Sequence, residues 1–247
     1  MMATFVLVPG WWLGGWAWDA VTRELTKAGH DVHPVTLPGL AERAGEATPH
    51  TDLDSYIADL RRLIEGRGLR EVILVGHSGG NMPVAGVAAQ VPDLVRRVVY
   101  VDTGPMPDGM SALDFYPPDA QQGMRAQVTE QGDGWLLPMR DWDAAADPVY
   151  LAGLTTEHLT LLGTAGTPQP FGPITQPLNR PGSRAVPGTV IATTFTPEQA
   201  RQLAASGNPV FAEMSGLDVV HLPTGHWPML SRPADLAALL DHQAAAA

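Results

Sequence analysis

The chain has 247 residues, a length that suits one large domain or two small ones with a sizeable core. Hydrophobic residues make up 45% and charged residues 17%, which is typical of a globular protein and argues against disorder. The absence of cysteine excludes disulfides, zinc–thiolate sites and a cysteine nucleophile. The formal charge of -11 argues against nucleic acid as a partner, because few positive charges remain to neutralise phosphates.

The N-terminal region has no pattern typical of a targeting segment. A secretory signal needs a basic region followed by a long apolar stretch, whereas here the apolar run Phe5–Val8 stops at Pro9-Gly10. No uncharged apolar run approaches the roughly 20 residues that a membrane span requires. We therefore expect a soluble, cytoplasmic protein that does not engage a membrane.

Short apolar strands alternate with helices along most of the chain. The expected strands are 4–8, 31–35, 71–75, 95–101, 189–193 and 217–222. The expected helices are 18–28, a segment capped by Thr51 or Asp52 and ended by Gly66, 79–91, 197–206 and 233–243. The alternation predicts βαβ units and a parallel sheet, and the solidly apolar strands indicate a sheet covered on both faces.

The alternation is interrupted between Gly104 and Pro187, a stretch with 12 of the 23 prolines and few strand-like runs. It is too long for a structureless loop, and it is inserted at the carboxyl end of a strand, where ligands of open α/β sheets bind. We predict a small helical cap at 104–187, inserted into a core made of 1–103 and 188–247.

The strongest chemical signal is the sequence Gly76-His77-Ser78-Gly79-Gly80. It matches G-x-S-x-G, directly after an expected strand and directly before an expected helix. A sharp turn in this context exposes a serine hydroxyl above the sheet, and the flanking glycines let the neighbouring backbone pass close by. The alternative interpretation is a glycine-rich turn with an incidental serine.

Two further stretches fit this interpretation. Val8–Trp18 is a loop rich in glycine and tryptophan after the first strand, and such a loop can supply a second backbone donor for an acyl-transfer serine. Leu222–Pro228 carries His226 between the last expected strand and the C-terminal helix. In folds of alternating strands and helices with a G-x-S-x-G turn, the histidine base of a triad lies at this position.

These stretches, together with 37–39 and 99–102, are similar to the α/β-hydrolase superfamily, and more narrowly to its small esterase branch of plant methylesterases, hydroxynitrile lyases and bacterial relatives. The resemblance implies the α/β-hydrolase fold, a mostly parallel sheet with helices on both faces and an inserted helical cap. It implies Ser78 as the nucleophile, His226 as the general base, and the backbone amides of Trp11 and Gly79 as the oxyanion hole. Lyase members carry a lysine directly after the catalytic histidine, and Trp227 in that position disfavours a cyanide-releasing lyase.

The triad acid stays open at the level of sequence. Many relatives place an aspartate in the turn after the penultimate strand, and 193–199 contains none. Asp102 ends the strand after the nucleophile helix, where some superfamily members have their acid, although it could instead cap the following loop. Glu198 precedes His226, yet it also fits the first turn of a helix. We predict Asp102, with Glu198 as the alternative and a Ser–His dyad as a further possibility.

Large apolar residues are frequent in the predicted cap and the loops around it. Most are expected to pack onto the core, but a cap over an active site exposes some inner surface to the substrate. The candidate substrate-binding residues are Trp12, His77, Met106, Trp135, Trp142 and Trp227. For His77 a structural role in the elbow competes with this one.

We therefore predict a serine hydrolase that cleaves a carboxylic ester or lactone of a small to medium apolar or aromatic substrate through an acyl-enzyme. It is expected to need no cofactor and no metal, with a small-molecule substrate as its partner. The sequence does not decide between a monomer and a homodimer. The alternative is a non-hydrolytic protein of the same fold, either a small-molecule receptor or a cyclase- or lyase-type catalyst acting on a natural product.

Overall fold

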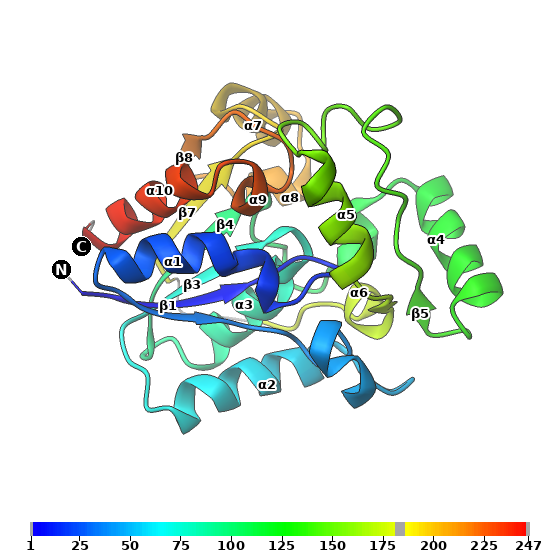
Figure 1. Cartoon of the computed structure of the whole chain (residues 1–247), viewed down its shortest axis with the longest axis horizontal. Coiled ribbons are helices and arrows are strands. Elements are labelled where there is room, and N and C mark those ends of the chain that lie inside the picture. Colours follow the sequence, from blue (N-terminus) through cyan, green and yellow to red (C-terminus); the bar gives the residue numbers. More distant parts are fainter. Residues whose placement is uncertain (1, 181–185, 246–247) are drawn as a thin grey trace.

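A parallel six-stranded sheet forms the centre of the protein (Figure 1). The structure is a computed structural model that describes residues 2–180 and 186–245. The strands are β1 (Thr4–Val8), β2 (Asp31–Pro34), β3 (Val72–His77), β4 (Val95–Val101), β7 (Gly188–Ala192) and β8 (Asp218–His221). Their order across the sheet is β2-β1-β3-β4-β7-β8, and every neighbouring pair is parallel.

Helices connect these strands on both sides of the sheet. They are α1 (Asp19–Lys27), α2 (Leu53–Gly66), α3 (Asn81–Gln90), α4 (Pro118–Gln131), α5 (Thr156–Ala165), α6 (Gly172–Thr175), α7 (Pro197–Ala205), α8 (Pro209–Ala212), α9 (Pro228–Ser231) and α10 (Pro233–Ala245). The predicted α/β class, the parallel sheet and the alternating elements are confirmed, with boundaries shifted by one or two residues. The short helices α8 and α9, each begun by a proline, were not predicted.

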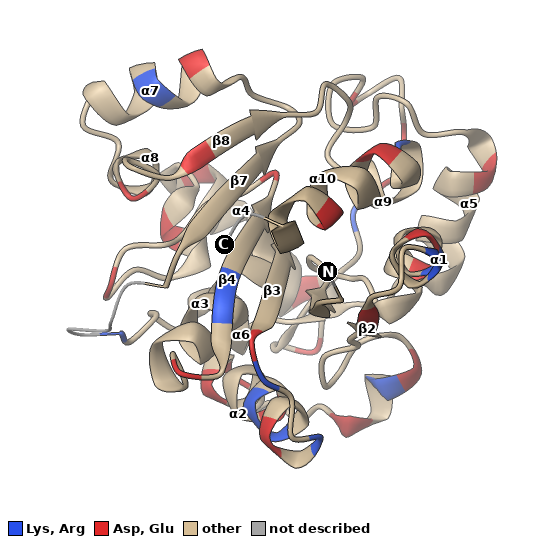
Figure 2. Cartoon of the chain, turned by 90° about the vertical axis from the view of Figure 1, so that its left-hand side faces the viewer, with Lys and Arg blue, Asp and Glu red and all other residues tan. Residues whose placement is uncertain are grey.

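The alternation of side chains along the strands produces two hydrophobic layers. In β1, Phe5 and Leu7 pack with α1 and α10 on one face, whereas Val6 and Val8 pack with α2 and α3 on the other. Figure 2 shows β3 and β7 without charged residues, while most of the Lys, Arg, Asp and Glu lie on the outer helices and loops. The first part of β4 carries arginines, and β8 begins with an aspartate. The sheet is therefore covered on both faces, as the apolar strands predicted.

The segment between β4 and β7 does not join the main sheet. It holds α4, α5, α6 and a small antiparallel pair, β5 (Leu136–Leu137) with β6 (Gln169–Pro170). In Figure 1 it lies on the right, on the side away from the N and C termini. We refer to it as the insertion. The predicted cap range 104–187 also includes 181–185, which lie outside the described residues, and its status as a separate domain stays a prediction.

The sheet reverses its direction of winding between β1 and β3. From β1 the chain moves outward to β2, then returns to β3 on the other side of β1 and continues outward through β4. In open α/β sheets, ligands bind at the carboxyl ends of the strands at such a reversal. The two loops that leave β1 and β3 at this point are the glycine- and tryptophan-rich loop and the Gly76–Gly80 turn.

The N-terminal end of α3 packs against the end of β1, so closely that position 80 has no room for a side chain. A Cβ atom there would lie 2.7 Å from the Pro9 carbonyl oxygen and 2.8 Å from that of Val8, both backbone atoms. We expect Gly80→Ala to lower the free energy of unfolding by about 1–3 kcal/mol, as overpacking does. Gly123 in α4 has no atom near its Cβ position, so Gly123→Ala is expected to raise that free energy by about 0.5–1 kcal/mol. Urea denaturation of both variants tests this, and equal effects of the two changes would contradict it.

Candidate active site

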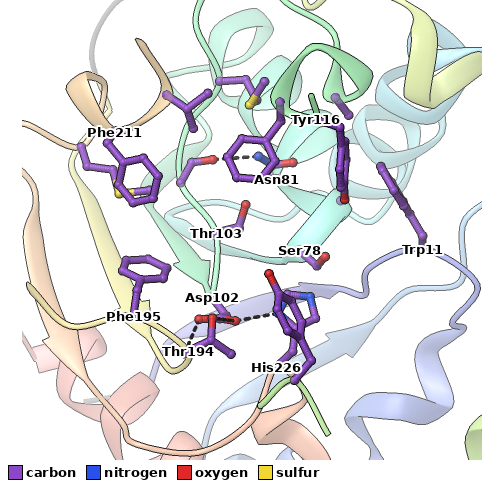
Figure 3. A pocket seen from close by; sticks show the side chains of 18 of the residues that line it. Trp11, Ser78, Asn81, Asp102, Thr103, Tyr116, Thr194, Phe195, Phe211 and His226 are labelled. Atoms are coloured by element: carbon purple, nitrogen blue, oxygen red, sulfur yellow. Dashed lines mark hydrogen bonds and ion pairs between the residues drawn. The ribbon is translucent and has the colours of Figure 1, made fainter. Parts of the chain in front are cut away.

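Ser78 lies on a strained turn between β3 and α3. Its φ of 50° is in the left-handed region, which is costly for a residue other than glycine. The turn is so tight that a Cβ at Gly76 would lie 2.7 Å from a methyl group of Val84. Ser78 lines a cavity above the carboxyl ends of the strands (Figure 3). The predicted sharp turn is therefore present, and it presents the serine hydroxyl to open space.

His226 is held by Asp102. The distance between His226 Nδ1 and Asp102 Oδ2 is 2.6 Å, so the imidazole donates its Nδ1–H to the carboxylate. His226 follows β8 and Asp102 directly follows β4, and Asp102 also has a left-handed φ of 48°. In Figure 3 the His226 ring and the Ser78 hydroxyl both lie at the wall of the same cavity. Because Nδ1 is engaged by Asp102, Nε2 is the ring nitrogen that remains for chemistry.

The Asp102 carboxylate is surrounded by hydrogen-bond donors. Oδ1 accepts from the backbone amides of Thr193 and Thr194, both at 2.8 Å, and Oδ2 accepts from the Thr194 hydroxyl at 2.8 Å. Burial alone would raise the pKa of Asp102, but the bond from His226 and these amides outweigh burial and lower the pKa to about 2. Asp102 is therefore ionised at neutral pH, and four donors fix its orientation.

The loop that carries His226 is attached to the insertion as well as to the core. Its backbone amides donate to the insertion, His226 to the Tyr150 carbonyl at 2.7 Å and Gly225 to the Ala152 carbonyl at 3.2 Å. On the core side, His77 Nε2 lies 2.7 Å from the His226 carbonyl oxygen. A carbonyl only accepts, so His77 is the donor and carries its proton on Nε2.

His77 acts as a structural residue here. Its side chain is buried, 1% of the residue is exposed, and it does not line the cavity. Its other nitrogen, Nδ1, faces Gly10 and has no hydrogen-bond partner among the described residues. Burial, followed by the nearby charge of His226, lowers the pKa of His77 to about 3. The ring therefore stays neutral across the physiological range.

Trp11 and Gly79 pack against each other beside Ser78, and both line the cavity. The Trp11 indole occupies the space that a side chain at Gly79 would need. The loop after β1 thus packs directly on the first residue after Ser78. The oxyanion hole that the family resemblance implies for the backbone amides of Trp11 and Gly79 stays a prediction.

Trp12, the next residue, is fixed by the insertion. Its φ is 67°, again left-handed. Its indole Nε1 donates to the Pro138 carbonyl at 3.0 Å, its backbone amide donates to Gln169 Oε1 at 3.3 Å, and its carbonyl accepts from Thr167 N at 3.0 Å. Gln169 is itself buried and donates to the Tyr56 hydroxyl at 3.1 Å. These contacts stabilise the strained conformation of the loop beside Ser78.

The cavity has a volume of about 310 Å³, within the usual range for small-molecule sites. Most of its wall is apolar: Met106, Ala112, Phe115, Tyr116, Val149, Phe195, Val210, Phe211 and Met214. No lysine or arginine is among the described residues that line it. The site therefore suits an uncharged, apolar or aromatic ligand.

The structure brings together some predicted site residues and leaves others outside. The same cavity is lined by six of them: Ser78, His226, Asp102, Trp11, Gly79 and Met106. The remaining candidates for substrate contact do not line it: Trp12, His77, Trp135, Trp142 and Trp227. Glu198 is on α7, where Arg201 and Gln202 bind its carboxylate and lower its pKa, and it makes no contact with His226. The geometry thus favours Asp102 over Glu198.

Packing explains why three of the predicted tryptophans, Trp12, Trp142 and Trp227, do not line the cavity. The rings of Trp12, Trp142 and Trp227 stack edge to face, with centroids 6.2 Å and 5.1 Å apart, and Arg140 covers the last two. This cluster joins the insertion to the core beside the site. Sequence reasoning missed Asn81, Thr194, Phe195 and Phe211 as lining residues. For Thr194 a signal existed, since it stands in the turn where an acid was sought.

Comparisons with known proteins agree with this geometry. The alpha/beta hydrolase family model matches residues 5–239. The chain belongs to this family. It is 30% identical to the carbendazim hydrolyzing esterase of a Nocardioides species over 97% of this chain and 98% of that one. It is 24% identical to the putative methylesterase 12 of Arabidopsis thaliana, over 96% of this chain and 70% of the relative.

Solved structures show the same fold. An extracellular alpha/beta-hydrolase from a Paenibacillus species, described as sharing homology with tobacco salicylic acid binding protein 2, superimposes with a TM-score of 0.80 at 20% identity. The superposition covers 97% of this chain and 98% of that structure. Within residues 2–180 and 186–245, no helix is long and apolar enough to cross a membrane, and no group of three metal-ligating side chains gathers.

The neutral, buried state of His77 predicts a dependence of stability on pH. The pKa is about 3 in the folded protein and 6.5 in the unfolded chain, so below pH 6.5 protons bind preferentially to the unfolded chain. The free energy of unfolding should therefore fall as the pH is lowered, by up to about 1.4 kcal/mol per unit. His77→Gln keeps a donor for the His226 carbonyl and removes this titration. We expect the difference between wild type and variant to change between pH 6 and pH 4 in urea titrations. Parallel curves for the two proteins would contradict the assignment.

Proposed function

We propose that this protein is a serine hydrolase that cleaves carboxylic esters through an acyl-enzyme. The observation that carries the proposal is the 2.6 Å hydrogen bond between Asp102 and His226 beside a serine held on a strained turn. The membership of the chain in the alpha/beta hydrolase family and the esterases among its relatives support the same activity.

In the proposed mechanism, the three side chains that line the cavity act together. Ser78 Oγ attacks the ester carbonyl, and His226 Nε2 takes the serine proton. The ionised Asp102 holds the imidazole in the correct tautomer and stabilises its charged form. His226 then protonates the leaving alcohol, and afterwards activates a water molecule that releases the acid from Ser78. The backbone amides of Trp11 and Gly79 donate to the oxyanion in both steps.

The cavity supports a particular class of substrate. Its walls are mostly apolar, and no lysine or arginine among the described lining residues is present to recognise an anionic group. The volume of about 310 Å³ accommodates a small to medium molecule. We infer an uncharged ester or lactone with an apolar or aromatic group. The esterases among the relatives and the hydrogen bond between His226 and Asp102 support hydrolysis, and no specific observation favours the non-hydrolytic alternative.

Replacement of the nucleophile is the primary test. Ser78→Ala is expected to lower kcat for a p-nitrophenyl ester by about 10³-fold or more, because no covalent intermediate can form. A fluorophosphonate probe should label the wild type at Ser78, as read by peptide mass spectrometry, and leave the variant unlabelled. Turnover by Ser78→Ala near the wild-type rate would overturn the assignment.

A second test separates the two carboxylates. Asp102→Asn should lower kcat by about 10³–10⁴-fold, because an asparagine no longer fixes the tautomer of His226. Glu198→Gln changes a carboxylate to an amide in the same way but at an exposed position on α7, and we expect little effect on kcat. A large fall in Glu198→Gln with a small fall in Asp102→Asn would reverse the choice of acid.

A further inference from the structure

Asn81 places a polar side chain in the apolar wall of the cavity. It is the first residue of α3, only 5% of it is exposed, and it lines the cavity together with Ser78 and His226. Figure 3 shows its amide above Thr103, on the side of the cavity that lies away from Asp102. It takes no part in the proposed triad or oxyanion hole, so its presence needs another explanation.

One hydrogen bond fixes the orientation of this amide. Asn81 Nδ2 donates to the Gly104 carbonyl oxygen at 2.8 Å. Because a carbonyl oxygen only accepts, the amide nitrogen must face Gly104 and Oδ1 must face the other way. The hydrogen bond to Gly104 thus pairs the amide nitrogen of Asn81 and fixes the direction in which Oδ1 points.

Within the part of the chain that the structure describes, Oδ1 has no hydrogen-bond partner. Oδ1 does not belong to the fully buried atoms without a partner, so it keeps access to the cavity. A ligand that covered this oxygen without donating a hydrogen bond to it would leave it unpaired, which is unfavourable. When such an atom belongs to a cavity wall, the missing partner is expected to come from a ligand. Since the oxygen of an amide can only accept, that partner must be an N–H or O–H group.

The other polar groups of the cavity do not make the same demand. The hydroxyls of Thr103, Tyr116 and Tyr150 can each donate or accept, so they adapt to either kind of ligand. The carboxylate of Asp102 already receives four donors. Asn81 Oδ1 is therefore a lining acceptor outside the proposed triad that only a donor on the ligand can pair.

We propose that Asn81 is a specificity-determining residue and that the ester cleaved at this site carries a hydroxyl or N–H donor in its apolar part, which binds Asn81 Oδ1. The proposal rests on the proposed esterase function and adds a substrate feature to it. Phe195 and Phe211 also line the cavity and make its wall apolar, so an ester without the donor leaves Oδ1 buried and unpaired. A site built in this way discriminates against the analogue that lacks the group.

The test compares ester pairs that differ only in a hydroxyl and a methyl group. Methyl mandelate and methyl 2-phenylpropanoate place the difference next to the carbonyl. Methyl 4-hydroxyphenylacetate and methyl 4-methylphenylacetate place it at the far end of the ring. The 2-arylethyl acetates with a 4-hydroxy or a 4-methyl group place it in the leaving alcohol. For each ester, kcat/KM is measured for the wild type and for Asn81→Leu, so that intrinsic reactivity cancels within each ester.

In at least one pair we expect Asn81→Leu to lower kcat/KM for the hydroxyl ester about tenfold more than for the methyl ester. Damage to the Gly104 contact lowers both members of a pair equally and does not produce this difference. Asn179→Leu makes the same change at an exposed asparagine and should leave every ratio unchanged. Equal effects of Asn81→Leu on both members of all three pairs would overturn the proposal.

Binding to the Ser78→Ala variant keeps the test independent of catalysis. Calorimetry on this variant, with and without Asn81→Leu, should show, in at least one of the three pairs, the hydroxyl member losing about tenfold in affinity and the methyl member losing little. If the wild type turned over none of these esters or p-nitrophenyl esters while this binding difference was present, the esterase proposal would fail and the role of Asn81 would stand. A lack of any binding difference would overturn the role of Asn81 even in an active esterase.

Discussion

The hydrogen-bonded carboxylate of Asp102 is the interaction on which the arrangement of the site depends. Asp102 directly follows β4, Thr193 and Thr194 follow β7, and His226 follows β8. Neighbouring parallel strands finish at the same edge of the sheet, and the register pairs the last residues of β4 with β7 and those of β7 with β8. One carboxylate therefore joins three strand ends. The hydrogen bonds that lower the pKa of Asp102 also hold the imidazole of His226 in position. The same bonds therefore keep Asp102 ionised and keep the His226 proton on Nδ1.

Much of this could be predicted from sequence, because the relevant signals are local. The Gly76–Gly80 turn needs small residues wherever the chain passes close to β1, and the apolar strands around it specify a buried parallel sheet. Ser78 and His226 follow from their places at the ends of strands. The acid was harder to predict, because Asp102 and Glu198 both have reasonable local surroundings. The choice between them depends on which strand ends are neighbours in space, and the structure supplies that information.

The substrate-contact residues were the weakest predictions, for a different reason. In a strand or helix the periodicity of the sequence tells which way a side chain points. The insertion has little regular structure around Trp135 and Trp142, so no periodicity applies there. Size and hydrophobicity were the only grounds for predicting that the tryptophans contact the substrate. In the structure, Trp142 and Trp227 pack against each other and Arg140 instead of facing the cavity. The cavity is lined instead by Phe195 and Phe211, which lie in and after the turn that follows β7.

The insertion does more than contribute side chains to the cavity wall. It holds the loop after β1 through three hydrogen bonds to Trp12, and it holds the loop after β8 through the carbonyls of Tyr150 and Ala152. Trp12, Ser78 and Asp102 all have left-handed backbone conformations, each of which costs about 1–3 kcal/mol. Such strained conformations persist only where contacts with the surrounding structure stabilise them by more than the strain costs. Because the insertion provides those contacts for Trp12, its folding is coupled to the geometry of the loop beside Ser78. A change that loosens the insertion should therefore affect this geometry even when it touches none of the side chains that line the cavity.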